Sequence, residues 1–102
     1  MLRLIGLGVR ARNAVVGVEQ VREAARKGSL QFAIVAPDAS MNSRDKIVPL
    51  LRGRRIKFVE GPSAAELGAA VGREQTAAVG IIDRQLARGI SELAHASIAS
   101  DS

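Results

Sequence analysis

The chain has 102 residues, of which 47% are hydrophobic, so it should fold as one domain with a small core. The absence of Cys and the presence of one His, His95, exclude disulfides, thiolate chemistry and a multi-histidine metal site, and disfavour a His-based catalytic triad. The near absence of aromatic side chains argues against a base-stacking platform, which leaves a small, non-enzymatic domain with a net charge of +5 as the expectation.

The first quarter of the chain predicts a helix, a short strand and a second helix. Leu2–Ala11 is expected to be helical, although Gly6 and Gly8 lower its helix propensity. A short strand is expected around Val15. The second helix, at 17–28, has apolar residues at helical spacing, an acidic first turn, a basic last turn and a terminal glycine.

The next segment predicts a buried strand followed by a helix. Phe32–Ala36 is a continuous apolar run that is β-branched at its centre, which is typical of a strand buried on both faces. Residues 41–52 have a helical pattern that ends at Gly53, with an inner face of Ile47, Val48, Leu50 and Leu51. Pro49 lies inside this pattern and should kink the helix or split it near Val48.

The second half of the chain continues the alternation of strands and helices. Ile56–Val59 predicts a short strand, and Ser63–Glu66 has the pattern of a capping box at the start of a helix that Gly72 ends. Thr76–Ile82 predicts a second fully apolar strand. Asp83 can cap the last helix, whose inner face is expected to comprise Leu86, Ile90, Leu93 and Ala94.

These elements together predict an α/β fold. Strands buried on both faces that alternate with helices indicate a three-layer α/β/α sandwich, with about four strands in a mixed sheet. We expect residues 1–96 to form this single domain and residues 97–102 to form a frayed tail. No stretch has the length of a targeting signal or a membrane-spanning helix, so a cytoplasmic location is expected.

The positive charge is distributed unevenly along the chain. Residues 1–55 carry a net charge of +7 and residues 56–102 a net charge of −2, and 12 of the 15 cations are arginines. Because the arginine fork suits phosphate, this asymmetry favours a nucleic-acid partner. Two other interpretations remain open: a GC-rich genome replaces Lys by Arg throughout, and a charge of +5 is ordinary for a soluble protein.

Three local patterns could carry chemistry. Gly6 and Gly8 lack the third glycine and the preceding strand of a dinucleotide site. Glu19 and Glu23 are four residues apart, and such carboxylate pairs usually form a solvated helix face rather than an acid–base pair. The segment 37–40 follows a buried strand and precedes a helix, so it could either bind an anion or cap the helix.

Five segments taken together resemble a known family. They are Gly6–Ala11, Gly17–Glu19, Ala33–Ser40, Glu66–Gly72 and the apolar strand that follows. Over residues 2–94, this pattern resembles the kink-turn-binding ribosomal proteins of the archaeal L-seven-Ae and eukaryotic L-thirty type. It is most similar to their bacterial YlxQ-like branch.

The resemblance implies an α/β/α sandwich that binds structured RNA, ribosomal RNA being one candidate, and that needs no cofactor or metal. In the family, RNA is held by the start of the second helix and by two loops, which match 17–23, 38–41 and 73–77 here. No DNA sequence specificity and no membrane contact are expected. With the basic residues nearby, the predicted RNA-binding residues are Arg10, Arg12, Gly17, Glu19, Gln20, Glu23, Lys27, Asp38, Ala39, Ser40, Met41, Arg73, Glu74, Gln75 and Thr76.

The second helix departs from the family at two positions. Glu19 stands where kink-turn binders carry an amide, and Glu23 stands where they carry a cation, so a carboxylate would approach phosphate. Arginines of the first half could then hold RNA less specifically. A protein-interaction or dimerisation module with a decayed RNA site is the alternative function, and a small-ligand binder that uses Asp38–Ser40 is a more remote one.

Overall fold

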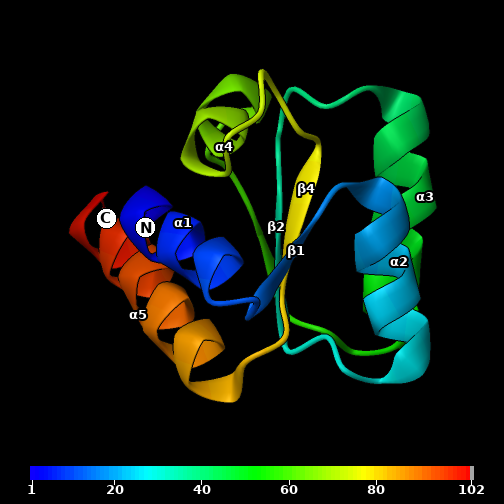
Figure 1. Ribbon diagram of the computed structural model, residues 1–102, viewed down its shortest axis with the longest axis horizontal. Helices are drawn as coiled ribbons and strands as arrows, with labels where there is room; N and C mark the ends of the chain where they lie inside the picture. Colours follow the sequence, from blue (N-terminus) through cyan, green and yellow to red (C-terminus); the bar gives the residue numbers. More distant parts are fainter. Residues whose placement is uncertain (102) are drawn as a thin grey trace.

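The computed structural model describes the backbone of residues 1–101 and the side chains of residues 1–94. Helices and strands alternate along the chain, as the sequence pattern predicts (Figure 1). The elements are α1 (Leu2–Arg10), β1 (Ala14–Val16), α2 (Val18–Lys27), β2 (Phe32–Val35), α3 (Met41–Gly53), β3 (Phe58–Glu60), α4 (Ala64–Ala70), β4 (Ala78–Ile81) and α5 (Arg84–Asp101).

The four strands form one mixed sheet in the order β1-β4-β2-β3. β2 and β3 are parallel, whereas β4 is antiparallel to both of its neighbours, β1 and β2. In this register, Ile34 lies opposite Val79 on one side and Val59 on the other. β1, β2 and β3 therefore run in the same direction, and β4 runs against them.

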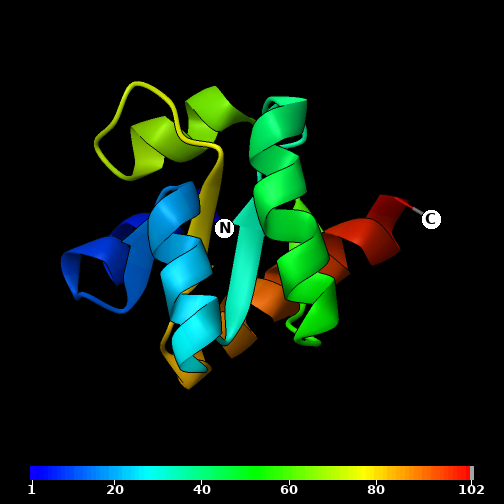
Figure 2. The same cartoon turned by 90° about the vertical axis from the view of Figure 1, so that its right-hand side faces the viewer.

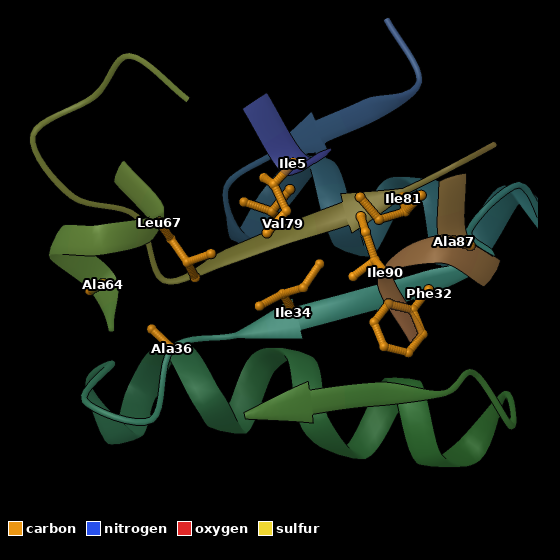
Figure 3. Close-up of a cluster of buried hydrophobic side chains, with 10 residues drawn as sticks. All are labelled: Ile5, Phe32, Ile34, Ala36, Ala64, Leu67, Val79, Ile81, Ala87 and Ile90. Atoms are coloured by element: carbon orange, nitrogen blue, oxygen red, sulfur yellow. The ribbon is translucent and has the colours of Figure 1, made fainter. Parts of the chain in front are cut away.

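Helices cover both faces of the sheet, which confirms the predicted three-layer sandwich. α2 and α3 lie on one face, and α1, α4 and α5 lie on the other (Figures 1 and 2). Because side chains alternate along a strand, β2 serves both cores. Ile34 packs toward α1, α4 and α5, together with Val79 and Leu67 (Figure 3). Ala33 and Val35 pack toward α2 and α3.

Most of the predicted helix ends are confirmed by their capping contacts. α2 ends at Gly28, whose φ of 77° is left-handed. α4 begins with the predicted capping box, in which the Ser63 side chain accepts from the Glu66 amide and the Glu66 side chain accepts from the Ser63 amide. The Oδ2 atom of Asp83 accepts a hydrogen bond of 2.8 Å from the amide of Leu86 and so caps α5.

Pro49 does not split its helix, so that part of the prediction is wrong. α3 continues from Met41 to Gly53 with Pro49 inside it. Proline removes the hydrogen bond to the carbonyl of Asp45, four residues earlier. Both residues are exposed, so water can solvate that carbonyl, and the helix can remain continuous on its outer side.

Three further details of the structure can be compared with the prediction. Leu93, expected to face inward, is 45% exposed, because it lies at the rim of a shallow hollow beside Met1 and Pro62. The third strand is Phe58–Glu60 rather than 56–59, because the amide of Ile56 bonds to the end of α3. The backbone of α5 continues to Asp101, through most of the segment expected to be frayed; Ser102 and the side chain of His95 lie outside the described residues.

Candidate nucleic-acid interface

Three segments that are distant in sequence meet at one end of the sheet. The amide of Gly17 donates to the carbonyl of Ala78 at 2.9 Å, and the amide of Ala36 donates to Ala77 at 2.8 Å. These bonds join the start of α2, the β2–α3 loop and the α4–β4 loop where β1 and β2 end and β4 begins. We call this surface the loop end; it comprises residues 17–20, 36–41 and 71–77 and lies in the upper half of Figure 1.

The turn from β1 into α2 places the first turn of α2 at the loop end. Gly17 has a φ of 96°, and a Cβ atom at this position would meet nothing within 4 Å, so the backbone conformation rather than crowding requires glycine. The side-chain Oε1 of Gln20 accepts a hydrogen bond of 3.1 Å from the amide of Val16. Glu19 is exposed and forms an ion pair of 3.4 Å with Arg22.

The β2–α3 loop uses its polar side chains to cap helices. The Oδ1 atom of Asp38 accepts a hydrogen bond of 2.8 Å from the amide of Ala64, at the start of α4. Ser40 Oγ accepts from the amide of Ser43 at 3.1 Å and caps α3. Ala39 is half-buried, whereas Met41 is 78% exposed and offers an apolar contact surface.

The α4–β4 loop divides into an exposed part and a buried part. Arg73, Glu74 and Gln75 are exposed. Thr76 is only 8% exposed: its amide donates to the carbonyl of Ala64, and its Oγ1 donates to Ala78 at 3.3 Å. Thr76 therefore holds the loop, and the three residues before it are the ones that can reach a ligand.

Four of the predicted RNA-binding residues lie away from the loop end. Arg10 and Arg12 precede β1, and the strand separates them from Gly17 at its other end. Lys27 is the last residue of α2, and Glu23 lies one turn before it; the two form an ion pair of 3.0 Å. The 15 predicted residues thus do not form one surface.

Glu23 and Lys27 line a cleft that leads away from the loop end. The cleft has a volume of about 350 Å³ and lies between α2 and β1, with Gln20 at the side nearest the loop end. Its walls also include Val15, Ala24, Ser29 and Ile82. The carboxylate of Glu23 therefore lines a cleft that continues from the loop end.

The Asp38 contact predicts a stability effect that is independent of any ligand. Replacing Asp38 by Ala should lower the free energy of unfolding by about 0.5–2 kcal/mol, because the amide of Ala64 loses its capping acceptor. Urea denaturation of Asp38→Ala measures the change. Asp45→Ala is the control, since Asp45 is also exposed and makes no side-chain hydrogen bond among the described residues. Equal stabilities of the two variants would contradict the capping role.

The sequence matches a known family and a characterised relative. Residues 1–94 match the model of the "Ribosomal protein L7Ae/L30e/S12e/Gadd45 family". The RNA-binding protein YlxQ of Bacillus subtilis (strain 168) is 28% identical over 90 residues, which cover 88% of this chain and 90% of that protein.

Solved structures show the same fold. A protein of unknown function from Bacillus halodurans superposes with a TM-score of 0.83 at 28% identity, covering 90% of this chain and 93% of the other. The Giardia lamblia 15.5kD RNA binding protein superposes with a TM-score of 0.80 at 19% identity, covering 96% of this chain and 84% of the other.

The fold and the site together define a class of protein: an α/β/α sandwich whose loops gather at one end of a four-stranded mixed sheet. The chain belongs to the Ribosomal protein L7Ae/L30e/S12e/Gadd45 family, which confirms the resemblance. This membership supports a binding protein rather than an enzyme. Among the described residues, no helix combines the length and apolar character needed to cross a bilayer, and no His, Asp and Glu cluster could hold a metal ion.

Proposed function

We propose that this protein binds structured RNA and that the loop end recognises a kinked RNA helix. The observation that carries the proposal is the hydrogen-bonded convergence of the start of α2 with the β2–α3 and α4–β4 loops. Family membership and the RNA-binding relative that is 28% identical over 90 residues support the same ligand class.

The loop end offers the three kinds of contact that a kinked RNA requires. The first amides of α2 have no intrahelical partner and can donate to a phosphate, and Gly17 leaves the space beside them open. Met41 can cover a base that has left the stack. The exposed side chains of Arg73 and Gln75 can reach phosphate and base edges.

The carboxylate of Glu23 tests whether α2 faces the RNA. Glu23→Lys should tighten binding to a kink-turn RNA and steepen the dependence of log K on log salt by about one unit, because it adds one phosphate contact. Titration of a kink-turn RNA and of an uninterrupted duplex at two salt concentrations measures both quantities. The ratio of the two affinities should rise in favour of the kink-turn RNA.

Glu92→Lys is the matched control for this experiment. Glu92 pairs with Arg88 across one turn of α5, as Glu23 pairs with Lys27 across one turn of α2. Each variant therefore breaks one such pair and makes the net charge of the protein more positive by two. Glu92→Lys should change the affinity for both RNAs by the same factor. If Glu23→Lys leaves both affinities unchanged at both salt concentrations, the face of α2 that continues from the loop end is not part of an RNA site, and the protein-interaction alternative gains support.

A further inference from the structure

The end of the sheet opposite the loop end gathers most of the positive charge. Because β1, β2 and β3 run against β4, the segments that lead into the first three strands and out of the fourth lie at the same end. These segments are residues 10–13, 26–31, 52–57 and 82–88, and we call them the cationic end. It holds ten of the 15 cations, namely Arg10, Arg12, Arg26, Lys27, Arg52, Arg54, Arg55, Lys57, Arg84 and Arg88.

Contacts join the four segments. The Nη1 atom of Arg54 lies 3.5 Å from the carbonyl of Arg26, which connects the end of α3 to the end of α2. Lys57, Arg84 and Arg88 line one shallow hollow of about 250 Å³ between the start of β3 and α5. The amide of Ile82 bonds to the carbonyl of Asn13, which brings the segment after β4 next to the segment before β1.

The cations of this end are exposed and almost unopposed. All ten side chains are exposed to solvent. Lys27 and Arg88 each pair with a carboxylate on their own helix, and the other eight form no ion pair with any described residue. Asp83 is the single carboxylate in these segments, and it already caps α5. In contrast, the loop end carries three carboxylates and one cation, Arg73.

We propose that the cationic end is a second RNA-binding surface, which contacts the sugar–phosphate backbone of an RNA helix. Eight of its ten cations are arginines, whose fork matches phosphate oxygens. Their mutual repulsion in the free protein is relieved when a polyanion binds. The surface recognises the negative charge of the RNA backbone rather than the base sequence, because phosphate contacts carry no direct base information. RNA as the ligand rests on the proposed function, whereas the location of this surface does not.

The test compares two double variants that each remove one Arg and one Lys. Arg54→Gln with Lys57→Gln neutralises the centre of the cationic end, and Arg3→Gln with Lys46→Gln removes exposed cations elsewhere. Binding of an uninterrupted RNA duplex and a kink-turn RNA is followed by fluorescence anisotropy between 50 and 200 mM KCl, conditions we choose because phosphate contacts are salt-sensitive.

The cationic-end variant should lose about tenfold in affinity for both RNAs at 100 mM KCl, and its salt slope should fall by about one to two units. The ratio of the two affinities should stay unchanged. The Arg3/Lys46 control should remain within about twofold of the parent protein, and both variants should keep the parent melting temperature, as exposed substitutions usually do.

Other outcomes overturn this inference. Equal losses in the two double variants would show an effect of net charge without a site, and unchanged binding would exclude the surface. If the cationic-end variant loses binding to phosphatidylserine vesicles but keeps its RNA affinity, the surface binds membranes instead. If the parent protein does not distinguish the kink-turn from the duplex, but the variant still loses duplex affinity, the loop-end proposal fails while this inference stands.

Discussion

Ile34→Ala is expected to lower the free energy of unfolding by about 2–5 kcal/mol, the usual range for a large-to-small change in a core. Ile34 is fully buried at the centre of β2, between Val79 on β4 and Val59 on β3. Its side chain fills the space under α1, α4 and α5 (Figure 3), and none of these helices can move inward without disturbing its neighbours. Urea denaturation measures the loss.

Two further variants calibrate this measurement. Ile34→Val removes one methyl group and should cost about 0.5–1.5 kcal/mol. Leu93→Ala makes a comparable truncation at a side chain that is 45% exposed, so it should cost clearly less than Ile34→Ala. A cost for Ile34→Ala below about 0.5 kcal/mol, the range of surface substitutions, would contradict its central position.

Gly68→Ala is expected to destabilise the protein by about 1–3 kcal/mol, as overpacking does, although alanine is the better helix former. A Cβ atom on Gly68 would lie 2.4 Å from the Cα and 2.6 Å from the nitrogen of Gln75. Both are backbone atoms, so the α4–β4 loop must move as a whole. Because that loop belongs to the loop end, we also expect the preference for kink-turn RNA over duplex RNA to fall by about tenfold, the factor that 1.4 kcal/mol represents.

Gly53→Ala is the control for the glycine experiment. Gly53 is the last residue of α3, and a Cβ atom there would meet nothing within 4 Å. This substitution should stabilise the protein slightly or leave it unchanged, and the preference among RNAs should not change. If Gly68→Ala behaves like Gly53→Ala in both measurements, α4 does not constrain the loop.

The strands were predictable from the sequence wherever both faces are buried. Phe32–Val35 and Ala78–Ile81 are fully buried and appear in the sequence as unbroken apolar runs. Positions that depend on tertiary neighbours were not predictable. The exposure of Leu93 depends on how α5 lies against the start of α1, and the continuity of α3 through Pro49 depends on which side of the helix faces water.

The distribution of charge could likewise be predicted only in part from the sequence. The sequence assigns the excess of positive charge to residues 1–55, yet Lys57, Arg84 and Arg88 of the second half also belong to the cationic end. Four short segments that are far apart in the chain meet there only because of the strand order. Gly68 was similarly visible in the sequence as part of the motif of residues 66–72, but its close approach to Gln75 became apparent only in the structure.

Because cations gather at one end of the sheet and carboxylates outnumber cations at the other, the charge of the free protein is polarised along the strands. In the field of a polyanion, such a molecule rotates before it makes contact, so encounters with the cationic end in front are favoured. Charges at this end should therefore govern the association rate constant and its salt dependence more than the dissociation rate constant. If RNA is the polyanion, as proposed, the loop end with its three carboxylates would face away from it at that moment and stay accessible to another RNA segment.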